Sequence, residues 1–514
     1  MYGTAKQISL ALVALVGLSS LLTLEGDRFW LVKGTAQAQQ ARQESTAWWA
    51  RFRGPNGSGV AEKDKPPVQF GPASKLLWKT ALPAGHSSPI VWDRHIFLTG
   101  LENDKLVVIA VRRADGKLLW KQAVPAEKIE KVHAFNSPAA PTPATDGQRV
   151  YVYFGSYGLM AFDFAGKEIW RKPLPLPPTQ YGTASSPIVY DDKVLLQRDG
   201  NDGKSELLAV DGKSGATVWQ TARPSQRESW STPTIWSHDG QDELLVVGNG
   251  RLVAYSPKDG SERWWVGGLS FAPITMAVSG DGLIFASTKT IAGAPGDRIE
   301  LPTWDALLQY DQNKDGKIAE DEFPADMGIH LRKDVPKETP GNFLPIREMV
   351  TRRDLDKDKA ISKSEWEGML SFMEKISDVV VAVRPGGKGD GAKSHVAWTA
   401  SRGIAEMPSP LFYRGRLYIV RDGGMVTSYE PATGKVILDR QRLGVLGQYV
   451  ASPVAADGRI YAASETGTVV VFSAGDSLEV LARNELGEGV RATPAISANK
   501  LYVRTLNHLW AFGN

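Results

Sequence analysis

The sequence contains no cysteine at all. This absence excludes a disulfide framework, cysteine-ligated zinc, thiol catalysis and a lipid anchor on an N-terminal cysteine. Positive charge is not in excess either, because 60 Lys and Arg stand against 57 Asp and Glu, for a net charge of +3. No dense basic stripe is visible, and a nucleic-acid-binding role therefore has no electrostatic support.

Common catalytic patterns are missing as well. The seven histidines show no metal-ligand spacing, and there is no G-x-S-x-G nucleophile motif. A GxGxxA string at 387–392 falls in a predicted hairpin rather than a strand-to-helix turn, so we interpret it as a loop. With 42% apolar and 23% charged residues, the composition is that of a globular protein.

The N-terminus has the pattern of an export signal. Lys6 precedes an apolar run over 8–24, and Ala36-Gln37-Ala38 follows as an A-x-A cleavage site. We predict a signal peptide over 1–38, followed by a linker and leader segment over 39–74. The alternative is an uncleaved membrane anchor formed by 8–24, which is short for a spanning helix. In either case we expect an exported protein of the periplasm or cell surface.

A dipeptide ending in proline recurs where strands are expected to begin. Proline is tolerated at the first residue of a strand. The copies are spaced by about one propeller blade, except for one interval, from Pro273 to Pro410, that is about three times longer. The copies are Ser88-Pro89, Thr142-Pro143, Ser186-Pro187, Thr232-Pro233, Ala272-Pro273, Ser409-Pro410, Ser452-Pro453 and Thr493-Pro494.

A turn with glycine, followed four residues later by tryptophan, closes each early unit. It occurs at 114–120, 164–170, 213–219 and 258–264. Glycine supplies the positive φ that a hairpin turn needs, and a tryptophan at a fixed position packs between neighbouring sheets. Eight units of about four strands predict an all-β fold, an eight-bladed β-propeller of four-stranded blades over 75–296 and 379–514. Because the last unit lacks a fourth strand, we expect Lys75–Thr80 to complete it and close the ring.

The long interval predicts an insertion over 297–378 within blade five. Two acidic stretches there match the EF-hand loop, in which alternate side chains converge on one calcium ion. The insertion is therefore predicted to be a small α-helical EF-hand pair, with structural calcium favoured over regulatory calcium. Lys359 replaces the usual glycine of the second loop, at a cost of about 1–2 kcal/mol. The predicted ligands are Asp311, Asn313, Asp315, the Lys317 carbonyl and Glu322, then Asp354, Asp356, Asp358, the Ala360 carbonyl and Glu365.

The blade unit resembles the pyrroloquinoline-quinone (PQQ)-like propeller repeat family, in a secreted bacterial branch. Phe52–Gly59 (FRGPNGSG) and His133–Gly147 (HAFNSPAAPTPATDG) carry the likeness to that branch. The family includes quinoprotein alcohol dehydrogenases and outer-membrane assembly scaffolds. The resemblance implies the propeller fold, but the adjacent cysteines of the dehydrogenases and the lipid anchor of the scaffolds are both missing. The resemblance therefore implies neither the dehydrogenase activity nor the assembly-scaffold role for this chain.

Propellers usually bind ligands at the funnel mouth, near the starts of the innermost strands. The candidates there are His86, Asn136, Tyr181, Glu228, Trp230, Tyr449 and Arg491, with Arg198 and Asp199 as additions. The leading hypothesis is a monomeric, calcium-stabilised, non-catalytic binding or scaffold module of the cell envelope. Its partner would be an envelope protein or a small molecule at the funnel. The alternative is a PQQ-dependent dehydrogenase of alcohols or sugars.

Overall fold

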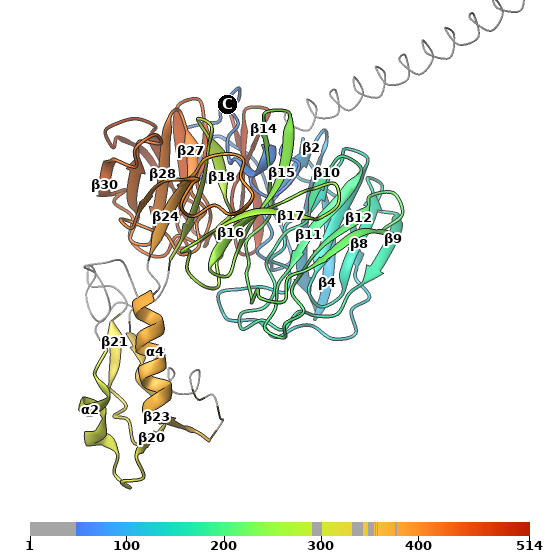
Figure 1. The fold of residues 1–514 in the computed structure, drawn as a ribbon. Helices are drawn as coiled ribbons and strands as arrows, with labels where there is room; N and C mark the ends of the chain where they lie inside the picture. Colours follow the sequence, from blue (N-terminus) through green and yellow to red (C-terminus); the bar gives the residue numbers. More distant parts are fainter. Residues whose placement is uncertain are drawn as a thin grey trace, which may run out of the picture. The chain divides into compact units, whose positions relative to one another are not determined.

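The computed structural model describes residues 48–289, 301–330, 343–347, 354, 356, 358–375 and 378–514. Eight antiparallel sheets of a β-propeller account for most of them (Figure 1). The predicted eight blades of four strands are thereby confirmed. Within the described residues no helix is long and apolar enough to span a membrane. The predicted signal segment over 1–38 lies outside them.

The first four blades follow the chain in order, each from its innermost to its outermost strand. Blade one contains β2 (Ile90–Trp92), β3 (His95–Glu102), β4 (Lys105–Arg112) and β5 (Leu118–Ala123). Blade two contains β6 (Ala144–Thr145), β7 (Arg149–Phe154), β8 (Gly158–Asp163) and β9 (Glu168–Pro173). Blade three contains β10 (Ile188–Tyr190), β11 (Lys193–Arg198), β12 (Glu206–Asp211) and β13 (Thr217–Ala222). Blade four contains β14 (Thr234–His238), β15 (Gln241–Gly248), β16 (Arg251–Tyr255) and β17 (Glu262–Gly267).

The later blades follow the same rule, with blade five interrupted. Blade five contains β18 (Val278–Gly280), β19 (Leu283–Thr288), β24 (Val379–Val383) and β26 (Val396–Ala400). Blade six contains β27 (Leu411–Tyr413), β28 (Arg416–Arg421), β29 (Met425–Tyr429) and β30 (Val436–Arg442). Blade seven contains β31 (Val454–Ala456), β32 (Arg459–Ala463), β33 (Thr468–Ser473) and β34 (Val480–Glu485). Blade eight contains β35 (Ala495–Ser497), β36 (Lys500–Arg504), β37 (His508–Gly513) and β1.

Blade eight closes the ring with a strand from the other end of the chain. The strand β1 (Leu76–Ala81) pairs antiparallel with β37, with Trp78 opposite Ala511. The closure predicted from Lys75–Thr80 is confirmed. Pairing the first strand with the last removes the open sheet edge that a linear array of blades would expose.

The hydroxyls of the proline dipeptides form a hydrogen-bonded ring around the innermost strands. In seven of the eight blades the backbone N–H at the Ser/Thr position donates to the hydroxyl of the next blade, at 2.9–3.1 Å. The bond from Thr493 to Ser88 carries the ring across the closure. A buried N–H must find an acceptor, and here the neighbouring blade supplies it.

One of the eight proline assignments is wrong. Pro273 does not open a strand, because β18 begins at Val278. Met276 holds the Ser/Thr position of blade five, since its N–H donates to Ser409 Oγ at 3.1 Å. The Ala272-Pro273 pair belongs to the preceding loop, where Ala272 has a φ of 53°. Methionine offers no hydroxyl, and so the ring is interrupted between blades four and five.

The repeated tryptophans join neighbouring blades, as predicted. The Trp120 indole N–H donates to the Phe164 carbonyl of the next blade at 2.9 Å. A Cβ on Gly166 would lie only 2.7 Å from that indole, so only glycine fits above it. The indoles of Trp78, Trp170, Trp219 and Trp398 dock on the next blade in the same way.

Blade four lacks this contact to blade five. The Trp264 indole N–H instead meets Glu243 of its own blade at 3.1 Å. The short strand β25 (Gly389–Asp390), in the β24–β26 connection, pairs in parallel with β17. This segment of blade five therefore bridges to blade four where the hydroxyl ring and the tryptophan contact are both missing.

The leader segment runs along the innermost strands of several blades. It forms bridges from Trp49 to Val91 and from Val60 to Ala455, with η1 (Pro55–Gly57) between them. The buried guanidinium of Arg53 donates to the Pro410 carbonyl at 2.8 Å. The leader thus contacts the innermost strands of blades that lie far apart in the sequence.

The insertion replaces the turn between β19 and β24 and has a small core of its own. The strands β20 (Lys317–Ala319) and β23 (Ala360–Ser362) pair so that Ile318 faces Ile361, as expected from the sequence. Helix α2 (Trp304–Leu307) continues into η2 (Leu308–Tyr310), and α4 spans Lys363–Lys375. The first loop leads not into a helix but toward β21 (Gly328–His330), which pairs with β22 (Phe343–Pro345). The described residues therefore do not confirm the predicted α-helical EF-hand pair.

Candidate functional site

Packed aromatic rings link the loops across the predicted funnel mouth. Phe135 stacks on His133 with ring centroids 5.4 Å apart, and His133 meets Tyr181 edge-on at 5.0 Å. Tyr181 in turn meets Trp230 at 5.4 Å. At the other end, the Arg491 guanidinium lies 5.5 Å from the Phe135 ring. Because Arg491 precedes blade eight and Trp230 precedes blade four, these contacts connect opposite sides of the ring.

Backbone hydrogen bonds hold these rings in place. The Asn136 amide N–H donates to the Tyr181 carbonyl at 2.8 Å. The Trp230 indole N–H donates to the Gly182 carbonyl at 2.5 Å. Three of the predicted funnel residues, Asn136, Tyr181 and Trp230, are therefore brought together. They pack against one another, and of the three only Trp230 also lines the cleft beside them.

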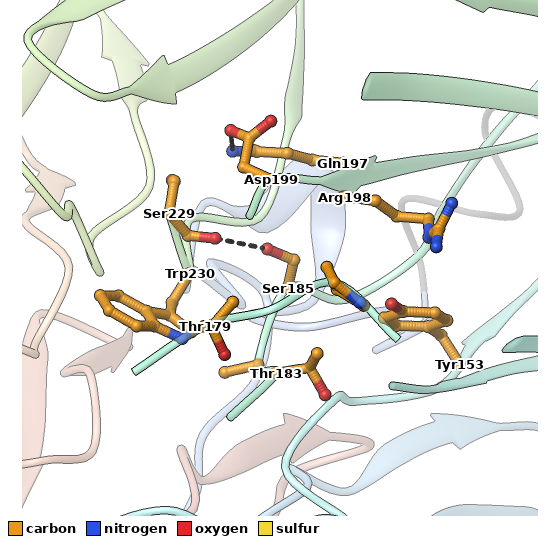
Figure 2. Close-up of a pocket in the computed structure, with 11 residues that line it drawn as sticks. Tyr153, Thr179, Thr183, Ser185, Gln197, Arg198, Asp199, Ser229 and Trp230 are labelled. Carbon is orange, nitrogen blue, oxygen red and sulfur yellow. Dashed lines mark hydrogen bonds between the residues drawn. The ribbon is translucent and has the colours of Figure 1, made fainter. Parts of the chain in front are cut away.

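A small cleft lies beside this cluster, between blades two, three and four (Figure 2). It encloses about 230 Å³, part of it open to solvent. Cofactor and ligand pockets usually enclose about 300–1,000 Å³, and this cleft is smaller. The Ser185 hydroxyl lies at its centre and donates to the Ser229 carbonyl at 3.4 Å. The polar lining residues include Tyr153, Thr179, Thr183, Ser185, Gln197, Arg198, Asp199 and Ser229.

The charges around this cleft are already paired. Asp199 Oδ2 accepts a bond of 2.7 Å from the Gln197 amide and lies 3.4 Å from Arg223 Nη1. Burial raises the pKa of Asp199, and the charge of Arg223 opposes that shift. Arg198 is the only cationic residue that lines the cleft, and its charge is already paired with Glu206. Burial also raises the pKa of Tyr153 to about 12.

Two buried acceptors remain unsatisfied in this part of the described chain, Asp199 Oδ1 and Gln197 Oε1. Buried polar atoms of this kind are commonly satisfied by ordered water. The cleft is therefore suited to water or a very small neutral donor. Sequence reasoning identified Trp230, Arg198 and Asp199 but missed Tyr153, Gln197 and Arg223. Gln197 could have been found, because it is a polar residue directly after the apolar run Val194–Leu196 of strand β11.

The other predicted funnel residues lie outside the cleft. Burial, with Arg491 and Arg504 nearby, lowers the pKa of His86 to about 3, so its imidazole is neutral. Glu228 Oε2 accepts the Gln180 N–H at 2.6 Å. Tyr449 is buried in the core of blades six and seven, and its hydroxyl donates to the Val445 carbonyl. Arg491 pairs with Glu465 at 2.8 Å. None of these four lines the cleft.

The first acidic loop of the insertion folds around its carboxylates. Asp311 accepts the N–H groups of Asp315 and Gly316, at 3.2 and 3.0 Å. Asp315 accepts the Lys317 N–H at 2.8 Å. Glu322, the last residue of the loop, accepts the Ala319 N–H at 2.8 Å. The loop therefore turns its acidic side chains inward.

The second acidic loop repeats this pattern position by position. Asp354 accepts the N–H groups of Asp358 and Lys359, at 3.1 and 2.8 Å. Asp358 accepts the Ala360 N–H at 2.9 Å, and Glu365 accepts the Ser362 N–H at 2.9 Å. Carboxylate oxygens of Asp354, Asp356 and Asp358 lie within 4.8 Å of one another. Three carboxylates this close repel each other unless a cation lies between them.

Two lysines modify the second loop. Lys359 has a φ of 69°, the left-handed conformation expected where a glycine is usual. Lys317 of the first loop extends its ammonium to Asp358, and to Asp356 at 3.5 Å. The hydrogen bond from Lys317 lowers the pKa of Asp358. The four acidic ligands predicted here and the four predicted side-chain ligands of the first loop all lie within their own loops.

Comparison with known proteins identifies relatives by fold. The family model described as outer membrane protein assembly factor BamB matches residues 68–239, 203–298 and 378–513. No curated protein matches the chain. Quinohemoprotein alcohol dehydrogenase ADHIIG from Pseudomonas putida HK5 is 13% identical, with 93% of this chain and 81% of that chain covered and a TM-score of 0.52.

Two further structures are similar to the same degree. Quinohemoprotein alcohol dehydrogenase from Comamonas testosteroni is 14% identical, with 91% and 81% covered and a TM-score of 0.52. A europium-containing methanol dehydrogenase is 11% identical, with 93% and 100% covered and a TM-score of 0.52. At these identities the likeness concerns the fold alone.

Proposed function

We infer that this chain, which belongs to the family of the outer membrane protein assembly factor BamB, is an exported calcium-binding propeller. It acts as a non-catalytic binding or scaffold module at the cell envelope. One observation carries the calcium assignment: the two acidic loops share the same carboxylate-to-amide pattern at the same positions. Oxygen-rich sites of this type suit the hard calcium ion.

Each proposed ligand has a defined role. In the first loop the side chains of Asp311, Asn313, Asp315 and Glu322 would supply oxygens, with the Lys317 carbonyl. In the second loop Asp354, Asp356, Asp358 and Glu365 would do so, with the Ala360 carbonyl. Most of these side chains are exposed or half-buried, and an ion can therefore enter from solvent. Because the insertion has only a small core, bound calcium would stabilise it by mass action.

Calcium titration of the full chain tests the assignment. The substitutions Glu322→Gln and Glu365→Gln keep the shape of each side chain and remove its charge. We expect wild type to bind two ions, each single variant one ion, and the double variant none. The matched control is Glu367→Gln on α4, whose carboxylate pairs with Lys363 at 3.7 Å, outside both loops. Undiminished calcium binding by the double variant would contradict the assignment.

The surface for an envelope partner is proposed to be the loop face of the propeller. In each blade the loop before the innermost strand and the turn between the second and third strands lie at the same end. Large apolar side chains are exposed there, the most exposed being Leu446 at 66%. Exposed apolar side chains gathered on one face favour a protein partner. They are Phe135, Leu176, Phe271, Leu446 and Leu506.

A site-specific photo-crosslinker tests this surface in cells. Placed at position 446, it should give a discrete adduct with an envelope protein. Leu118 on the outer strand β5 is the control, because it is 52% exposed but lies on the side of blade one. Equal adducts from both positions, or none from position 446, would contradict a loop-face partner.

Export is tested separately by sequencing the mature N-terminus, which should begin at Gln39.

A PQQ-dependent dehydrogenase is the second candidate, supported by the likeness of the fold to quinohemoprotein alcohol dehydrogenases. The residues around the cleft do not fit this cofactor. PQQ is a planar tricyclic tricarboxylate, but the only cation lining the cleft is already paired with Glu206, and Asp199 adds a carboxylate. Reconstitution with PQQ and calcium decides between the candidates. A bound chromophore together with dye-linked alcohol or sugar oxidation would overturn the non-catalytic assignment.

A further inference from the structure

The side chain of Lys317 connects the two acidic loops. Lys317 lies in β20 and is paired with Ser362 of β23, so its backbone is fixed beside the second loop. Its Nζ contacts Asp358 Oδ2 and lies 3.5 Å from Asp356 Oδ2. Asp356 and Asp358 belong to the trio of carboxylates that lie within 4.8 Å of one another. An ammonium from the first loop thus occupies the region where the second loop would hold its ion.

We propose that Lys317 is a tethered counter-ion of the second loop, which calcium must displace, so that the first loop fills first. The proposal rests on the calcium function above and adds an order of filling to it. The ammonium neutralises part of the carboxylate repulsion when no ion is bound. Calcium needs the same carboxylate oxygens, because it takes six to eight oxygen ligands. No side chain from the second loop contacts the carboxylates of the first loop in the described residues.

The size of the effect follows from the exposure of the pair. The side chains of Lys317 and Asp358 are 38% and 34% exposed. Ion pairs of this exposure are weak, and this one should change calcium affinity by at most about fivefold. We therefore expect Lys317 to weaken the second loop by roughly threefold to fivefold. The effect on the first loop should be smaller, because that loop uses the Lys317 carbonyl and not its ammonium.

The test uses the full chain with one loop disabled at a time. With Glu322→Gln only the second loop can bind, and with Glu365→Gln only the first. Lys317→Met should tighten calcium binding about threefold or more in the first background and by a smaller factor in the second. Lys314→Met is the matched control, since it removes the same charge from the first loop but has no ion pair with Asp356 or Asp358.

Each outcome is decisive. An equal gain from Lys314→Met would show a general charge effect and overturn the proposal, as would no gain or a loss from Lys317→Met. If wild type binds no calcium, the calcium function fails and the proposal falls with it.

A second measurement needs no variant: amine labelling of Lys317, read by mass spectrometry, should speed up when saturating calcium is added, while Lys314 labels at an unchanged rate. Unchanged labelling of Lys317 would contradict its displacement.

Discussion

At the scale of single residues, the two acidic loops differ at their sixth position. Gly316 has a φ of 79° and Lys359 a φ of 69°, so the backbone turns alike in both loops. A side chain in this region costs about 1–2 kcal/mol, whereas glycine adopts it freely. Calcium binding at the second loop would therefore be favoured by its four carboxylates and opposed by the local strain at Lys359 and by the ammonium of Lys317.

Substitution of Lys359 separates the strain from the charge. Lys359→Ala removes the positive charge and keeps Cβ, while Lys359→Gly removes both. We expect Lys359→Gly to bind calcium about threefold to tenfold more tightly at the second loop than Lys359→Ala, because an ion-free loop with Cβ relaxes away from the binding conformation. Calorimetric titration in the Glu322→Gln background measures the difference. Equal affinities of the two variants would show that the strain does not oppose binding.

Burial of Tyr153 predicts a loss of stability in alkali. Its pKa is raised to about 12 in the folded chain, while an unfolded tyrosine ionises near pH 10. Between these values the folded state holds a proton that the unfolded state has lost, so stability falls as pH rises. The difference in unfolding free energy between wild type and Tyr153→Phe should shrink by about 2 kcal/mol from pH 9 to pH 12. Denaturant unfolding at both values measures it, and a constant difference would contradict the raised pKa.

At the scale of elements, the proline dipeptides could be located from the sequence, but the hydrogen bonds by which their hydroxyls join neighbouring blades could not. Proline at a strand start explained the recurrence, and the pattern placed seven of the strands. The hydroxyl has a separate role, because its acceptor bond joins two sequence-distant blades and no local pattern reveals it. For the same reason Ala272-Pro273 was mistaken for a strand start. Met276, which holds that position, has neither the proline nor the hydroxyl as a signal.

Removing one hydroxyl of the ring should lower stability. Ser186→Ala leaves the buried N–H of Thr142 without its acceptor at 2.9 Å. An unsatisfied buried donor costs about 1–3 kcal/mol. We expect a loss in that range by denaturant unfolding, against less than about 0.5 kcal/mol for the exposed Ser74→Ala. A Ser186→Ala variant as stable as the control would show that the ring does not hold the blades together.

The tryptophan contacts make a second prediction between elements. Gly215 has a φ of 73° and lies above Trp170, where a Cβ would be 2.7 Å from the indole. Gly240 has nearly the same φ, 72°, but open space around it. Gly215→Ala should therefore cost about 1–3 kcal/mol more than Gly240→Ala, the difference being the clash alone. Equal losses in thermal unfolding would mean that the indole moves aside without cost.

At the scale of the whole molecule, the closed ring of blades and the position of the insertion were predictable from the sequence. The side-chain contacts at the funnel mouth were not. Spacing placed the closing strand with Trp78 and the insertion in blade five, since each follows from counting repeats. The funnel depends on contacts between loops far apart in sequence, such as Phe135 with Arg491. The candidates chosen by position were therefore divided between the aromatic cluster, the cleft and the core. The propeller emerges as a closed scaffold whose proposed metal chemistry lies in the insertion.

Crystals grown with terbium in place of calcium, measured at the terbium absorption edge, test this account most directly. We predict two anomalous peaks per chain, one surrounded by Asp311, Asp315 and Glu322 and one by Asp354, Asp358 and Glu365, the first filling at the lower terbium concentration. No peak is expected beside Asp199 in the cleft. A metal peak at the funnel mouth, or loops that stay free of terbium at saturation, would contradict the assignment of the metal chemistry to the insertion.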